Sequence, residues 1–180
     1  STRAGRHIAL EEVIREAIAK ARALVDEKRP DLSEAERKKI AHAVGIAALK
    51  YNDLSQNRQS DIAFRWEKML NLEGNSAPYL MYTYARFASI IRKEKPTKFK
   101  GQSLGVPETD LVLKLIQFPD VVRRVTETYF PHLLTDYLYD FAQIANRFYH
   151  AEPVLNAEDN LRNLRLNLVQ AVARTMKTGL

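Results

Sequence analysis

The sequence predicts an all-α protein, and three observations support that prediction. Apolar residues recur at intervals of three and four positions along much of the 180 residues, the spacing of one helix face. Prolines separate several of these stretches, at Pro107, Pro119 and Pro131, where the first turn of a helix accepts a residue without a backbone N–H. With 46% hydrophobic residues and only six glycines, the chain is typical of a globular domain. We therefore expect a helical bundle preceded by a helical linking segment.

The charge balance favours an anionic partner. The chain has 28 Lys and Arg against 22 Asp and Glu, a net charge of +6. Between Arg86 and Lys100 there are six basic residues against Glu94 alone. The longest apolar run, Ala43–Leu49, is far shorter than a membrane span, and no apolar leader follows a charged start. The absence of cysteine excludes disulfides and thiolate metal sites and is consistent with a cytoplasmic protein.

The sequence of the N-terminal part predicts two long helices, followed by a short segment that fits more than one structure. The first helix runs from about Ala9 to Lys28. Ser33–Glu36 has the pattern of a capping box, so the second helix runs from Glu34 to about Leu54. Residues 61–66 are either a short strand or an extended crossing before a brief helix at Glu67–Leu72. The residues expected on the core faces are Leu10, Ile14, Ala17, Ala21 and Leu24 in the first helix and Ile40, Val44, Ala47 and Leu49 in the second, with Gly45 allowing close helix approach.

A helix that begins near Pro78 carries two separate faces. Ser76 can cap it, and Pro78 suits its first turn. The core stripe comprises Leu80, Tyr84, Phe87 and Ile91, and the second stripe comprises Tyr79, Tyr82, Arg86 and Lys93. Two aromatic rings with two cations suit a surface that stacks on bases and neutralises phosphate. An aromatic stripe with helical spacing is, however, more often part of a core than of a site.

The C-terminal half predicts four more helices after a loop at Pro96–Val106. They are Glu108–Phe118, Asp120–Tyr129, His132–His150 and a final helix from about Ala157 to the C-terminus. Their expected core residues are Leu134, Leu138, Phe141, Ala145 and Phe148 in the third of these helices and Leu161, Leu164, Leu168 and Val172 in the fourth.

The sequence contains residues suited to binding but no recognisable catalytic motif. The four histidines are scattered and lack the H-x-x-x-H or H-E-x-x-H spacing of a metal site. Neither a G-x-G-x-x-G motif nor a phosphate-binding P-loop is present. We therefore expect no catalytic residue, no metal and no cofactor in this chain.

Four segments of the sequence resemble the class I arginyl-tRNA synthetases. EGNSAPYLMYTYAR (73–86) resembles the entry to their C-terminal anticodon-binding domain, with Met81 in place of the usual glutamine. Residues 43–70 resemble the region that links their catalytic and helical domains. Asp159–Leu166 resembles the D-x-L-R-x-x-R-L motif that gives such anticodon-binding domains their name. The first residues, Ser1, Thr2 and Arg3, resemble the end of the second ATP-site signature.

The resemblance covers nearly the whole chain and implies that its two parts belong to different domains. It implies that residues 1–71 are the end of the catalytic domain with linking helices, and that residues 72–180 are the anticodon-binding domain. The partners would be arginine tRNA and the missing catalytic half, in the cytoplasm, with neither DNA nor a membrane involved. The whole ligase would use ATP and Mg²⁺ to join arginine to tRNA, and this part alone would be inactive. Such enzymes usually continue past Leu180 with a short tail that also touches the tRNA.

The resemblance also implies specific binding residues. A single-stranded anticodon loop is read by stacking and by hydrogen bonds to base edges. Tyr149 matches a tyrosine that faces the anticodon, and Lys98 and Lys100 would join Arg86 in contacting phosphates. The complete expected tRNA-binding set is Glu73, Gly74, Asn75, Ser76, Tyr79, Tyr82, Arg86, Lys98, Lys100 and Tyr149, with Ser1, Thr2 and Arg3 as the remnant of the ATP loop.

Two other functions fit the same composition. A helical protein–protein interaction module would use the basic loop only for solubility, and a non-specific RNA-binding domain would use it without reading bases. The sequence leaves open whether the chain is stable alone and which anticodon base each tyrosine meets.

Overall fold

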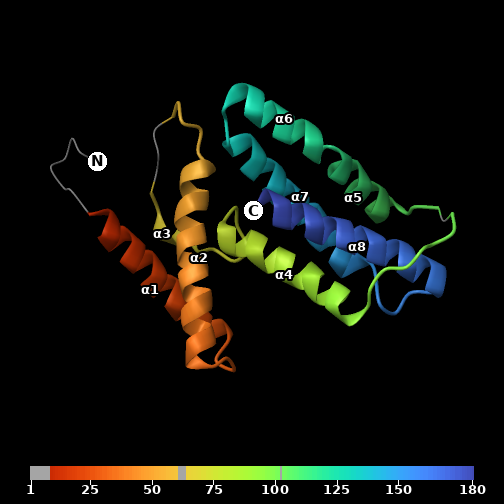
Figure 1. Ribbon diagram of the computed structural model, residues 1–180, viewed down its shortest axis with the longest axis horizontal. Helices are drawn as coiled ribbons and strands as arrows, with labels where there is room; N and C mark the ends of the chain where they lie inside the picture. The colour runs from red at the N-terminus through yellow and green to blue at the C-terminus, as the bar shows by residue number, and fades with distance from the viewer. Residues whose placement is uncertain (1–8, 61–63, 102) are drawn as a thin grey trace. The chain divides into compact units, whose positions relative to one another are not determined.

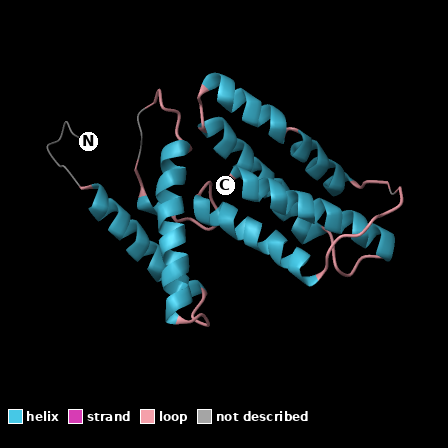
Figure 2. Cartoon of the chain, in the orientation of Figure 1, coloured by secondary structure: helices cyan, strands magenta, loops and turns pink. Residues whose placement is uncertain are grey.

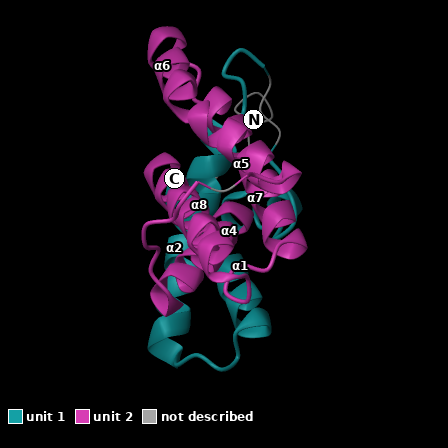
Figure 3. Ribbon diagram, turned by 90° about the vertical axis from the view of Figure 1, so that its right-hand side faces the viewer, with its two compact units in different colours: residues 1–78 teal, residues 79–180 magenta. Residues whose placement is uncertain are grey.

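The computed structural model describes residues 9–60, 64–101 and 103–180, and the described residues form helices and no strand (Figures 1 and 2). Two compact units are present, residues 1–78 and 79–180 (Figure 3). The helices are α1 (Leu10–Lys28), α2 (Glu34–Leu54), α3 (Trp66–Met69), α4 (Ala77–Lys93), α5 (Val106–Ile116), α6 (Phe118–Thr128), α7 (His132–Ala151) and α8 (Asp159–Gly179). The all-α prediction is confirmed. The predicted division between residues 71 and 72 remains a proposal.

In the first unit, α1 and α2 pack through small side chains. Gly45 lies so close to α1 that an added Cβ would stand 2.9 Å from the Cα of Ile18. The expected close approach is therefore confirmed. The buried residues at this crossing are Ala17, Ala21 and Val25 of α1 and Ala41, Gly45, Ala48 and Tyr51 of α2.

The core faces predicted for these two helices were partly wrong. Leu10 and Ile40 are exposed by 69% and 39%, and Val44, Ala47 and Leu49 are only half-buried. A close crossing admits alanine and glycine and leaves the larger side chains at its flanks. The hydrophobic periodicity therefore identified the helices but placed the buried stripe of α2 about one residue away.

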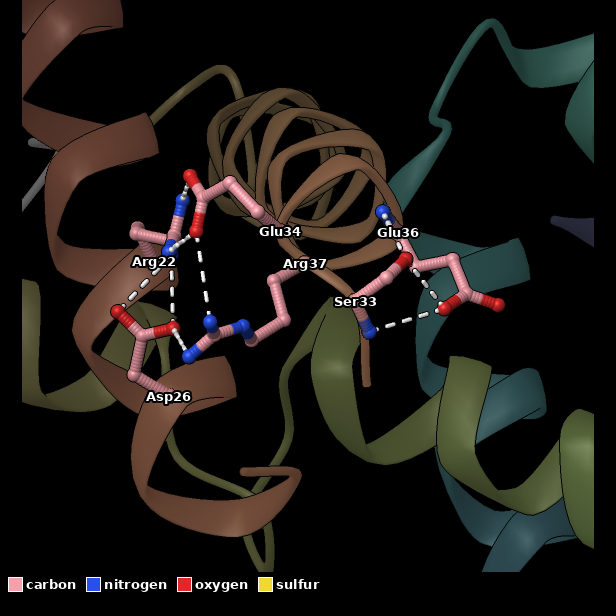
Figure 4. A network of polar contacts seen from close by, with 6 residues as sticks. All are labelled: Arg22, Asp26, Ser33, Glu34, Glu36 and Arg37. Atoms are coloured by element: carbon pink, nitrogen blue, oxygen red, sulfur yellow. Dashed lines mark hydrogen bonds and ion pairs between the residues drawn. The ribbon is translucent and has the colours of Figure 1, made fainter. Parts of the chain in front are cut away.

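The corner between α1 and α2 is fixed by two polar networks (Figure 4). The Arg22 guanidinium donates two hydrogen bonds to the Glu34 carboxylate, at 2.6 and 2.7 Å, and its Nε donates to the Asp26 carboxylate at 2.8 Å. Its guanidinium lowers the pKa of Glu34 by hydrogen bonding. Ser33 and Glu36 complete the predicted capping box: the Glu36 carboxylate accepts from the Ser33 backbone N–H, and the Ser33 hydroxyl accepts from the Glu36 N–H. The start of α2 at Glu34 is thus confirmed.

Substituting Gly45 by alanine is expected to destabilise the first unit by about 1–2 kcal/mol. Overpacking a close contact costs roughly 1–3 kcal/mol, while alanine regains up to about 1 kcal/mol of helix propensity. Chemical denaturation followed by circular dichroism measures the difference. Gly101→Ala is the matched control, because nothing lies within 4 Å of the Cβ it adds. A Gly45→Ala chain as stable as the control would show that α1 and α2 do not pack this closely.

The second unit is a bundle of helices α4 to α8, in which each of the other helices contacts α7. α5, α6 and α8 all pack against α7 (Figure 1). Side-chain hydrogen bonds join α4 to α7. Pro107 and Pro119 lie in the first turns of α5 and α6, as predicted, whereas Pro131 is the N-cap residue immediately before α7. The largest fully buried side chains here are Leu80, Phe87, Leu111, Leu138, Phe141, Phe148, Leu166, Val169, Val172 and Met176.

A buried ionic contact joins α5, α8 and the end of α7. The Arg165 Nε donates to Glu108 Oε1 at 2.8 Å, and both side chains are less than a tenth exposed. Arg165 also pairs with Glu152 and donates to the Pro153 carbonyl at 2.8 Å. A guanidinium has five N–H donors, so one arginine can bind all three partners.

Candidate nucleic-acid interface

Helices α4 and α7 bring five polar and aromatic side chains together. We call Tyr79, Tyr82, Arg86, Asn146 and Tyr149 the Arg86 cluster. Tyr79, Tyr82 and Arg86 share a face of α4 because their spacings of three and four residues match the helical repeat. Asn146 and Tyr149 do the same on the last turns of α7. The packing of α4 on α7 thus unites residues about sixty positions apart in sequence.

Arg86 lies between two tyrosine rings. Its guanidinium carbon is 4.8 Å from the centre of the Tyr82 ring and 4.6 Å from that of Tyr149. Both distances are within the range of cation–π attraction, and the planar guanidinium can lie against a ring as an ammonium cannot. Arg86 therefore contacts both rings, and the Tyr149 ring also packs against Phe87, with 6.2 Å between the ring centres.

Asn146 connects Arg86 to Tyr79. Its Oδ1 accepts a 2.8 Å hydrogen bond from Arg86 Nη1, while its Nδ2 donates to the Tyr79 hydroxyl at 3.1 Å. The Nδ2 also donates to Thr83 Oγ1 at 2.9 Å, and that buried hydroxyl in turn donates to the Tyr79 carbonyl. A guanidinium can only donate, so the amide oxygen must face Arg86 and the amide nitrogen must face the hydroxyls. The orientation of Asn146 is thereby fixed.

The Arg86 cluster borders an open hollow and keeps its aromatic rings accessible. Tyr82 is 55% exposed and Tyr149 is 37% exposed. His150 Nε2 lies 3.3 Å from Arg86 Nη1, beside the Tyr149 ring. The hollow is lined by Tyr79, Gln143, Asn146, Arg147, His150 and Ala151. Accessible rings beside hydrogen-bonding groups form a surface that can stack on a splayed base and bind its edge.

The residues predicted from 73 to 76 lie in a turn of the first unit, and their side chains differ in accessibility. Glu73 is exposed, and its N–H donates to Asn71 Oδ1 at 2.8 Å. Asn75 accepts a 2.5 Å hydrogen bond from the Tyr51 hydroxyl. Ser76 is buried and donates to the Asn71 carbonyl. At Gly74, an added Cβ would stand 3.0 Å from Asn71 Nδ2. The contacts of Asn75 and Ser76 shape the turn, and Glu73 is left as its outward side chain.

Lys98 and Lys100 lie on the loop between α4 and α5, where both side chains are exposed. The ATP-loop residues Ser1, Thr2 and Arg3 lie outside the described residues. Within the described part of the chain, no three His, Asp or Glu side chains gather as a metal site. None of the helices described here has the length and apolar character needed to cross a membrane.

Sequence reasoning missed Asn146 as a central member of the cluster. It is not in the expected tRNA-binding set, although its spacing of three residues from Tyr149 places both on one face of α7. Thr83 was missed altogether, because a threonine between tyrosines gives no sign that it is buried. Only the packing of α4 on α7 shows that both take part.

The chain is similar to arginine–tRNA ligases over its whole length. It is 51% identical to the arginine–tRNA ligase of Laribacter hongkongensis and 45% identical to that of Chromobacterium violaceum, each over 99% of this chain and 32% of the relative. It therefore spans about a third of the length of these curated relatives. The structure matches Thermus thermophilus arginyl-tRNA synthetase with a TM-score of 0.88 and 35% identity, over 96% of this chain and 30% of that one.

Two family models match successive parts of the chain. Residues 1–66 match the catalytic domain of class I (R) tRNA synthetases. Residues 80–180, more than half of the sequence, match the DALR anticodon binding domain. The chain therefore belongs to the DALR anticodon binding domain family.

Proposed function

We propose that this chain binds the anticodon stem-loop of arginine tRNA as the C-terminal part of an arginine–tRNA ligase. The observation that carries the proposal is the Arg86 cluster, an accessible aromatic surface within the part of the chain that matches an anticodon binding domain. The tyrosines would stack on bases of the loop, each contributing on the order of 1–3 kcal/mol. Tyr82 and Tyr149 are the best placed because they are the most exposed rings of the cluster.

The other site residues would have distinct roles. Arg86 would hold the two rings apart and present its remaining N–H groups to the RNA, while Asn146 would hold Arg86. Lys98 and Lys100 would contact backbone phosphates without regard to sequence. Glu73 would be the residue of the 73–76 turn that reaches a base, whereas Gly74, Asn75 and Ser76 would give the turn its shape.

The whole ligase would join arginine to tRNA with ATP and Mg²⁺ in the cytoplasm. Its ATP and Mg²⁺ would be held by the catalytic half, to which Ser1, Thr2 and Arg3 would contribute the end of a loop. Residues 1–71 would be the end of the catalytic domain with its linking helices, and they would lead to the anticodon-binding domain at 72–180. This chain would supply selection of the tRNA and not the chemistry.

Substituting Tyr149 by alanine is expected to weaken binding of arginine tRNA by about 10–100-fold, because one stacked base loses its platform. Fluorescence anisotropy with a labelled tRNA measures the dissociation constant. Tyr149→Phe keeps the ring and should bind within about threefold of the original chain. Tyr129→Ala is the control, because Tyr129 is 71% exposed at the end of α6, outside the cluster. Equal affinity of Tyr149→Ala and the control would contradict the assignment of Tyr149.

A protein-docking module would behave differently in the same titration. Its binding to tRNA would be weak, would fall with salt and would respond equally to all three tyrosine variants. That outcome would overturn the proposed function.

A further inference from the structure

The loop between α4 and α5 is held against α8 by three asparagines. Asn160, Asn163 and Asn167 are spaced by three and four residues, so they lie along one face of α8, and we call them the asparagine ladder. The loop is not helical, so its backbone N–H and C=O groups need partners from elsewhere. The asparagine ladder supplies several of them.

Each asparagine of the ladder binds a particular point of the loop. Asn167 Nδ2 donates to the Thr97 carbonyl at 2.9 Å, and Asn163 Oδ1 accepts from the Thr97 N–H at 3.2 Å and from its hydroxyl at 2.7 Å. Asn160 makes two bonds to Lys100: its Oδ1 accepts from the N–H at 2.9 Å, and its Nδ2 donates to the carbonyl at 3.2 Å. An amide side chain offers a donor and an acceptor on two separate atoms without adding charge.

These bonds fix the loop by its backbone and leave its side chains exposed. Thr97 and Lys100 are anchored, while the side chains of Lys98, Phe99 and Lys100 remain in solvent, with Phe99 44% exposed. The loop and α8 together border a second open hollow, lined by residues 95–99, Asn167 and Gln170. Two cations and an aromatic ring are thus presented from a fixed backbone.

Arg162 pairs with one carboxylate at the start of this loop and with another on α8. It pairs with Glu94 at 3.1 Å and with Asp159 at 2.6 Å. Glu94 lies at the start of the loop, and Asp159 lies beside Asn160 on α8. Arg162 offsets part of the charge of these two carboxylates, and within the described part of the chain neither acid pairs with Lys95, Lys98 or Lys100.

We propose that the asparagine ladder positions Lys98 and Lys100 to bind RNA backbone phosphates, so that the loop acts as a preformed element of the RNA-binding surface. This inference rests on the proposed function and adds three positioning residues to it. A loop ordered before binding loses less conformational entropy when it meets the RNA. Because the asparagines are uncharged, they do not reduce the positive charge of the lysines.

The test compares three variants in titrations of arginine tRNA at about 50 mM and about 200 mM salt. Lys98→Ala/Lys100→Ala should weaken binding by about 10–50-fold and lower the slope of log Kd against log salt by about 1.5, from the loss of two phosphate contacts. Asn160→Ala/Asn167→Ala should weaken binding by about 3–10-fold and lower the slope in the same direction. Asn156→Ala, an exposed asparagine between α7 and α8, should change neither.

If the asparagine ladder acts through Lys98 and Lys100, the effects of the lysine and asparagine substitutions should not be additive. Once Lys98 and Lys100 are alanine, adding Asn160→Ala/Asn167→Ala should cause no further loss. A further loss of the same size, or ladder variants with unchanged affinity and salt slope, would overturn the inference. Thermal unfolding checks that each variant is folded. If the double asparagine variant unfolds, Asn160→Ala alone, which removes both bonds to Lys100, takes its place in the comparison.

A parallel titration with a tRNA whose middle anticodon base is replaced separates this inference from the proposed function. If the base change weakens binding while the lysine and ladder variants have no effect, the inference alone is wrong. If neither the base change nor the lysines matter, the proposed function is wrong as well.

Discussion

Replacing Arg86 with methionine is expected to weaken the binding of arginine tRNA by about 100-fold. The guanidinium lies between the rings of Tyr82 and Tyr149 and is fixed by Asn146. Methionine keeps much of the volume but removes the cation and the hydrogen bonds, so both rings lose the guanidinium that they contact. If each ring stacks on a base, the combined loss is roughly 2–4 kcal/mol, and 1.4 kcal/mol corresponds to a tenfold change.

Fluorescence anisotropy with arginine tRNA measures this loss, and two further variants identify its cause. Arg86→Lys should lose most of the affinity too, because an ammonium cannot lie flat between two rings. Arg92→Met removes an exposed arginine from the same helix and should cost only the few-fold effect of one charge. An Arg86→Met chain that is folded and binds within about threefold of the original would show that Arg86 does not organise the site.

Replacing Arg165 with methionine is expected to destabilise the second unit by about 3–5 kcal/mol. Glu108, which is almost wholly buried, would lose its cationic partner, and an unpaired buried charge is costly. Glu152 and the Pro153 carbonyl would lose their donor as well. Denaturation followed by circular dichroism measures the change in the free energy of unfolding.

Arg162 provides a matched control in the same D-x-L-R-x-x-R-L motif. Its ion pairs with Glu94 and Asp159 are partly solvated, so Arg162→Met should cost less than about 1 kcal/mol. Arg165→Met/Glu108→Met should recover much of the stability, because the uncompensated charge is removed with its partner. Equal effects of Arg162→Met and Arg165→Met would contradict the structural distinction between the two arginines.

The helices could be predicted from local signals, whereas their exact core faces could not. The capping box at Ser33 and the first-turn prolines 107 and 119 act within a few residues, and the structure places helix starts at or within two residues of the predicted positions. The buried face depends on the neighbouring helix. At the Gly45 crossing the backbones approach so closely that alanines are buried and Ile40 is left at the flank. The spacing of apolar residues alone does not reveal which residues such a close helix crossing buries.

The candidate site was predictable to the extent that it lies on one helix. The spacing of Tyr79, Tyr82 and Arg86 shows that they share a face, but the sequence does not show that Arg86 lies between Tyr82 and a ring from α7. The expectation that Arg86 contacts phosphate stays a prediction, and the structure adds its packing role. Tyr149 was proposed through family resemblance, since a tyrosine near a helix end is more often a packing residue.

The most direct test of anticodon reading is a comparison of two RNAs. Arginine tRNA and the same tRNA with its middle anticodon base replaced would be titrated with the 180-residue chain under identical salt. Phosphate contacts are the same in both, so they cancel in the ratio of dissociation constants. The account predicts that the base change weakens binding by about 10–100-fold, the contribution of one recognised base. Equal affinity for the two RNAs would contradict it and would leave this chain as a basic surface that does not read the anticodon.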